Sequence, residues 1–79
     1  MSDSEEQWDE ERAVWLLREA GALVAAYAAE GARIPDREMY HARITEAHDA
    51  RDMDAYREAL NGYVQVARES YRRRSRGEG

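Results

Sequence analysis

The sequence predicts an all-α fold, a small three-helix bundle with a long N-terminal helix that dimerises through that helix. Apolar residues recur at spacings of three and four over most of the chain, which is the period of an amphipathic helix. Two interruptions, at residues 31–36 and 50–52, divide this pattern into three segments. We therefore expect a single helical domain over residues 5–74, with disordered ends at residues 1–4 and 75–79.

Length and composition narrow the class of protein. With 79 residues the chain is long enough for one domain only. Apolar residues make up 43% and charged residues 37%, which is too apolar for a disordered chain and too charged for a membrane protein. There is no cysteine, which excludes thiolate metal sites. The acidic residues 1–11 do not resemble a signal peptide, and no apolar run approaches the ~20 residues of a membrane span. These features predict a cytoplasmic protein.

The first helix, over residues 5–30, is predicted to have two apolar faces. One stripe suits the core of the bundle and comprises Ala13, Leu16, Leu17, Ala20, Leu23, Val24 and Tyr27. A second stripe lies more than a quarter turn around the helix and comprises Trp8, Trp15, Ala22, Ala26 and Ala29. A surface helix of a monomer carries polar residues on its back. The second stripe therefore predicts a contact with another molecule.

The two remaining helices follow from the signals that separate them. Gly31 suits the end of the first helix, and Pro35 suits the start of a second helix over residues 35–50. Asp52 is a good N-cap residue and predicts a third helix over residues 52–73. The third helix has the clearest apolar stripe, which comprises Met53, Tyr56, Leu60, Tyr63, Val64, Ala67 and Tyr71. The second helix has a weaker stripe of Met39, Tyr40, Ile44, Ala47 and Ala50.

The second stripe of the first helix is complementary to a second copy of itself. Two copies can pair antiparallel about a centre between residues 18 and 19, so that large side chains meet small ones. The resulting pairs are Trp15 with Ala22, Trp8 with Ala29, and Arg18 with Glu19. Buried tryptophans are common anchors of protein interfaces. Two alternatives remain: the face binds a larger partner protein, or both tryptophans lie in the core of a monomer.

Glu38, His41 and His48 are the residues that most resemble a metal site. Glu38 and His41 have the Glu-x-x-His spacing that carboxylate di-iron bundles use. Such sites also need glutamate ligands from facing helices, whereas Glu38 and His41 lie opposite the apolar side of their own helix. His48 lies nearer the core, where a pair with Asp52 or Glu46 is an alternative. We therefore expect no metal and no cofactor.

The C-terminal end of the chain carries an arginine cluster, which comprises Arg68, Arg72, Arg73, Arg74 and Arg76. Such clusters contact phosphates in nucleic-acid-binding proteins, but basic residues at a helix C-terminus also suit the helix dipole. The net charge of −5 argues against general nucleic-acid binding. A small nucleic-acid-binding accessory protein is therefore the alternative function and not the first one.

No group of residues predicts an enzyme. The chain lacks a cysteine nucleophile and a Gly-rich phosphate loop, and its serines have no neighbouring histidine and acid in the sequence. The sequence therefore predicts a non-enzymatic interaction or adaptor module, which either self-associates or docks on a larger protein. Its expected interface residues are Trp8, Trp15, Arg18, Glu19, Ala22, Ala26 and Ala29.

Overall fold

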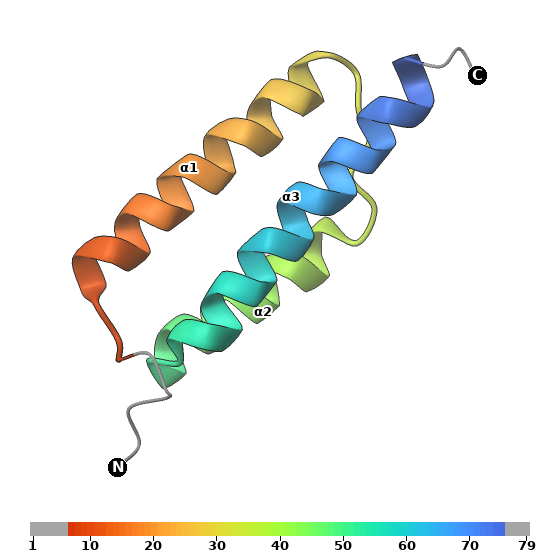
Figure 1. Ribbon diagram of the computed structural model, residues 1–79. Helices are drawn as coiled ribbons and strands as arrows, with labels where there is room; N and C mark the ends of the chain where they lie inside the picture. Colours follow the sequence, from red (N-terminus) through yellow and green to blue (C-terminus); the bar gives the residue numbers. More distant parts are fainter. Residues whose placement is uncertain (1–6, 76–79) are drawn as a thin grey trace.

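The computed structural model describes residues 7–75, which fold into three helices (Figure 1). They are α1 (Glu10–Ala29), α2 (Arg37–Ala50) and α3 (Met53–Ser75). The described part contains no strand, so the prediction of an all-α three-helix bundle is confirmed. The disorder expected at residues 1–4 and 76–79 falls outside the described residues. Ser75 was expected in the C-terminal tail but is the last residue of α3.

Asp9 decides where α1 begins. Its carboxylate accepts a hydrogen bond from the backbone N–H of Arg12 at 3.2 Å, and Glu10 and Glu11 follow in the first turn. An aspartate N-cap and acidic residues near a helix N-terminus both stabilise the first turn. The helix therefore begins at Glu10 and not at residue 5, and residues 7–9 precede it in a non-helical conformation.

A Schellman motif ends α1. The backbone N–H groups of Gly31 and Ala32 donate to the carbonyl oxygens of Ala28 and Tyr27, at 2.9 and 3.0 Å. Gly31 has a left-handed conformation (φ 99°), which glycine adopts without the steric penalty that a Cβ atom brings. The prediction that Gly31 ends the first helix is confirmed.

The turn between α2 and α3 repeats this motif with an arginine at the left-handed position. The backbone N–H of Arg51 (φ 56°) donates to the carbonyl of His48, and that of Asp52 donates to Ala47. The Asp52 carboxylate then accepts a hydrogen bond from the backbone N–H of Ala55 at 3.1 Å, which caps α3 as predicted. This short connection makes α2 and α3 an antiparallel helical hairpin (Figure 1).

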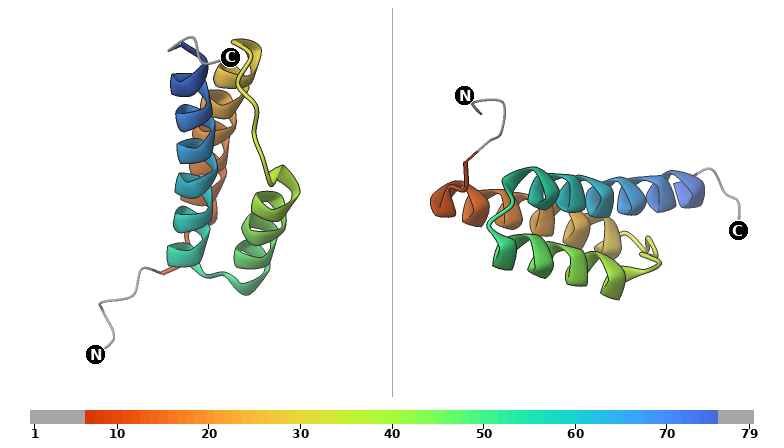
Figure 2. Two further views of the ribbon diagram at one scale, coloured as in Figure 1. Left: turned by 90° about the vertical axis from the view of Figure 1, so that its right-hand side faces the viewer. Right: turned by 90° about the horizontal axis from the view of Figure 1, so that it is seen from below.

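In the described part of the chain, α3 is the helix that packs against both of the others. No Cα atom of α1 lies within 8 Å of a Cα atom of α2. α1 runs parallel to α3, and α2 runs antiparallel to both (Figure 1). α2 begins at Arg37 and not at the predicted residue 35, and it lies beside the N-terminal half of α3 (Figure 2). The first helix was expected to share one core with both other helices, and its buried side chains do join those of α2 and α3 in one cluster, although its backbone approaches α3 alone.

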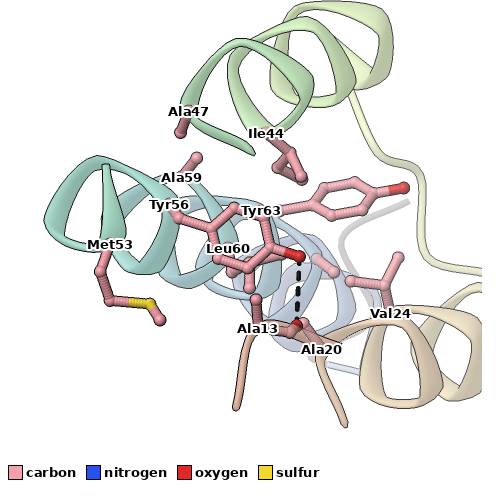
Figure 3. Packing of buried hydrophobic residues seen from close by; sticks show 11 residues of the cluster. Ala13, Ala20, Val24, Ile44, Ala47, Met53, Tyr56, Ala59, Leu60 and Tyr63 are labelled. Carbon is pink, nitrogen blue, oxygen red and sulfur yellow. Dashed lines mark hydrogen bonds between the residues drawn. The ribbon is translucent and has the colours of Figure 1, made fainter. Parts of the chain in front are cut away.

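The core is built on one face of α3 (Figure 3). The Tyr56 hydroxyl donates a hydrogen bond to the backbone carbonyl of Ala13 at 3.2 Å and so ties α3 to α1. Burial raises the pKa of the Tyr56 phenol, which keeps this donor protonated. The ring of Tyr63 extends between Ile44 of α2 and Val24 of α1, where the three helices meet. The buried residues of α3 are Met53, Tyr56, Ala59, Leu60, Tyr63 and Ala67.

α1 meets α3 through small residues. The buried residues of α1 are Ala13, Ala20 and Val24. Small side chains at a helix contact allow the two backbones to approach closely. Leu17 and Leu23 were predicted for the core stripe, but they lie on the two flanks of this narrow contact and are 47% and 44% exposed. The buried strip of α1 is thus narrower than the sequence pattern predicts.

Two glycines inside helices provide a matched test of this packing. A Cβ atom added at Gly21 would meet no atom within 4 Å, whereas one at Gly62 would lie 3.1 Å from Cε1 of Tyr40. Because alanine is favoured over glycine inside a helix, we expect Gly21→Ala to raise the free energy of unfolding by about 0.5–1 kcal/mol. Gly62→Ala should gain less or lose stability, because the Tyr40 ring must move. Urea unfolding followed by circular dichroism measures both changes, and equal gains would contradict the packing of Tyr40 on α3.

Candidate protein interaction site

Several large apolar side chains of α1 are exposed, whereas its three buried residues are small or of medium size. Trp15 is 57% exposed and Val14 is 51% exposed, in addition to the two flanking leucines. No residue from Ala20 to Ala29 carries a charge. Single exposed apolar residues are common on protein surfaces, but contiguous ones mark sites of interaction. The exposed surface of α1 is therefore the candidate site.

The centre of this surface is a strip that we name the outer face of α1, defined as Trp15, Ala22, Ala26 and Ala29. All four residues are exposed. At about 100° per residue they fall on the side of the helix opposite the buried Ala20. The strip combines one large side chain with three small ones, so its surface has a ridge beside a shallow region.

Arg18 and Glu19 lie on the two edges of the outer face. Both side chains are exposed, and their positions are about 100° apart around the helix. Together with the outer face they account for six of the seven predicted interface residues, and these six lie on one exposed side of α1. The seventh residue, Trp8, lies elsewhere.

Trp8 packs against its own bundle and does not belong to the outer face. It precedes the N-cap of α1 and is half-buried. Its ring lies edge-on to the rings of His48 and Tyr56, each with centroids 5.3 Å apart, and the guanidinium of Arg51 lies 5.8 Å from the ring centroid. One sequence signal could have indicated this position: an apolar residue directly before an N-cap, here Asp9, commonly folds back as a hydrophobic staple.

Glu10 links Trp8 to α2. The Trp8 indole N–H donates to the Glu10 carboxylate at 2.9 Å, and this hydrogen bond is the main reason why the pKa of Glu10 lies below its ordinary value of 4.5. Nε2 of His48 lies 3.5 Å from the other carboxylate oxygen and lowers the pKa further. Arg51 adds a smaller effect in the same direction. This corner joins the start of α1 to the end of α2.

The three residues considered for a metal site have separate surroundings. Nε2 of His41 lies 3.1 Å from the hydroxyl of Tyr63, and the His41 ring is edge-on to the Tyr63 ring. Nε2 of His48 contacts Glu10, and its Nδ1 lies 3.9 Å from Oδ1 of Asp49. The expected partners Asp52 and Glu46 form no hydrogen bond or ion pair with it. Glu38 is exposed on α2. Within residues 7–75, no three His, Asp or Glu side chains gather as a metal site requires.

The arginine cluster is only partly within the described residues. Arg68, Arg72 and Arg73 are exposed on the last turns of α3. Arg68 and Arg72 are four residues apart and share one side of the helix, whereas Arg73 lies about 100° away from Arg72. The side chain of Arg74 and all of Arg76 fall outside the description. The described arginines therefore spread around the helix end and do not form a single strip.

Comparisons with known proteins add no family to this picture. No protein-family model matches the sequence, and comparison with curated proteins and with solved structures gives no significant match. None of the three helices between residues 7 and 75 combines the length and the hydropathy that crossing a lipid bilayer requires.

The lowered pKa of Glu10 makes part of the stability depend on pH. Because folding favours the carboxylate, its contribution is present above pH 4.5 and is lost as the pH falls through the lowered pKa. We expect Glu10→Gln to reduce the free energy of unfolding at neutral pH, and we expect this difference to shrink as the pH falls below 4.5. Urea unfolding across this pH range measures the difference. Glu11→Gln removes a charge from the same helical turn and is the matched control; an identical pH profile for both variants would contradict the role of Glu10.

Proposed function

We propose that this chain is a small non-enzymatic helical module for protein–protein interaction, which self-associates through the outer face of α1. The observation that carries the proposal is the exposure of Trp15 on a helix whose buried residues are two alanines and a valine. Burying a large apolar side chain is favourable by about 1.5–3 kcal/mol relative to leaving it in water. A complex in which a partner covers Trp15 is therefore stabilised by this burial, whereas in the isolated bundle the side chain stays in contact with water.

A second copy of α1 has the shape to cover this side chain. In an antiparallel pair centred between residues 18 and 19, Trp15 of each copy faces Ala22 of the other. Ala26 and Ala29 continue the shallow region beside the indole ring. The contact between Trp8 and Ala29 that the sequence predicted is not part of this arrangement, because Trp8 packs on its own bundle. Trp15 is thus the anchor of the proposed interface.

Charge supports the same register. Arg18 and Glu19 lie on opposite edges of the outer face. A two-fold axis between them gathers two arginines and two glutamates around the centre of the pair. Arginine and glutamate attract each other across the interface, and both side chains are long enough to adjust. These charges set the register of the two helices, whereas the burial of Trp15 supplies most of the affinity.

Replacement of Trp15 by aspartate tests the proposal. Because Trp15 is exposed, the variant should keep its helical content, measured by circular dichroism. We expect light scattering on a size-exclusion column to give a dimer mass for the unmodified protein and a monomer mass for Trp15→Asp. The dimer should persist as the salt concentration rises, since apolar burial is not weakened by salt as phosphate contacts are.

Met39→Asp is the matched control, because Met39 is 39% exposed and lies on α2 away from the outer face. This variant should keep the dimer mass. If the unmodified protein is a monomer at all concentrations, self-association is wrong, and the outer face then requires a larger partner. Association that falls steeply with salt and needs added nucleic acid would instead favour a role for Arg68, Arg72 and Arg73.

A further inference from the structure

A groove between α1 and α2 is a second surface that the fold leaves open. It follows from the arrangement of the helices, because α1 and α2 both lean on α3 without backbone contact between them. The groove has a volume of about 430 Å³. Its floor contains Leu60 and Tyr63, which are buried residues of α3. We name it the α1/α2 groove.

The α1 wall of this groove is apolar and partly flat. Leu17 and Val24 line it, and Gly21 lies between them. A Cβ atom at Gly21 would meet nothing within 4 Å, so an incoming backbone can approach the helix closely there. Leu17 contributes an exposed apolar side chain beside this opening. This wall thus offers apolar contact without any charge.

Among the described residues, the groove is lined by basic side chains and by no acidic one, whereas the whole chain has a negative net charge. No carboxylate lines it, although the chain carries 17 acidic residues and a net charge of −5. Its α2 wall contains the exposed Arg37 and His41. By comparison, the surface depressions on the other flank of α1 and between α2 and α3 are each lined by both acidic and basic side chains. The groove therefore favours an occupant with negative charge next to an apolar face.

The shape of the groove favours a helix over a small molecule. Small ligands bind in sites that enclose most of their surface, whereas this groove is open between two helices. An amphipathic helix can lay its apolar stripe along such a groove, with side chains at spacings of three and four as anchors. The neighbouring helices then pack at ordinary helix–helix distances.

We propose that the α1/α2 groove binds an acidic amphipathic helix of a partner protein. Apolar side chains of this partner helix, such as leucines, lie on Leu60 and beside Gly21. A carboxylate next to its apolar stripe pairs with the Arg37 guanidinium. This site goes beyond the self-association proposed for the outer face of α1, because the two surfaces use different sides of that helix. One chain can therefore hold a second copy and a partner helix together.

Two synthetic peptides of about 18 residues, long enough to form helices, test the charge preference. Both carry leucines at helical spacing, with glutamates beside the stripe in one and lysines in the other. Fluorescence anisotropy of labelled peptide is measured against the full chain. We expect the glutamate peptide to bind at least about fivefold more tightly, as one good charge pair allows. The acidic net charge of the protein opposes this preference, so a local cationic site must cause it.

Variants then locate the site. Arg37→Glu should weaken binding of the glutamate peptide about fivefold or more. Arg43→Glu makes the same charge change on the same helix but outside the groove, and it should have a clearly smaller effect. Gly21→Leu fills the groove and should weaken binding about tenfold, while its helical content stays unchanged. Met39→Asp changes a residue outside both the groove and the outer face, and it should leave peptide binding unchanged.

Four results would overturn the proposal. The first is equal or tighter binding of the lysine peptide. The second is absence of binding by the glutamate peptide at concentrations where the protein is folded and soluble. The third is unchanged binding by Gly21→Leu, which would place the peptide elsewhere. If binding is lost with Trp15→Asp instead, the peptide occupies the outer face of α1, and the groove is not its site.

Discussion

The bundle depends on the apolar face of α3, because the backbones of α1 and α2 both pack against this helix and not against each other. Tyr56 ties the start of α1 to α3 through its hydrogen bond to Ala13. At the opposite end, the backbone N–H of Arg33 donates to Oγ of Ser70 at 2.9 Å, which attaches the connection between α1 and α2 to the end of α3. Both ends of α1 are thus held by α3, and its middle meets the bundle through a narrow contact at Ala20 and Val24, with Leu16 packed beside it.

Both proposed surfaces are consequences of this single line of contact. A helix that packs against two neighbours buries about half of its circumference, whereas α1 buries three residues of small or medium size. The outer face and the α1/α2 groove are the parts of α1 that a second neighbour would otherwise cover. Trp15 and Leu17 are exposed for the same reason, although they lie on different sides of the helix. Because α1 buries few residues in the core, a large part of its apolar surface remains exposed.

The helices could be predicted from the sequence because their signals are local. The spacing of apolar residues, the left-handed Gly31 and the Asp52 cap each act within one or two turns. The partner of each helix face could not be predicted. An apolar stripe indicates that a face of the helix is covered, but it does not identify the helix or the second molecule that covers it. For this reason Trp8 was assigned to the interface although it packs on its own bundle. Similarly, Gly62 lies within the predicted third helix, but the sequence does not show that the Tyr40 ring packs on it.

The order of contacts along the chain also affects how the bundle can open. α2 and α3 are joined by a two-residue connection, so their contacts are close in sequence, whereas Tyr56 and Ala13 are 43 positions apart. Separation of α1 from the bundle breaks these distant contacts, whereas the two-residue connection keeps α2 and α3 together. A partner that binds the outer face or the α1/α2 groove leaves the contact between α1 and α3 in place, so its binding stabilises the folded bundle by mass action.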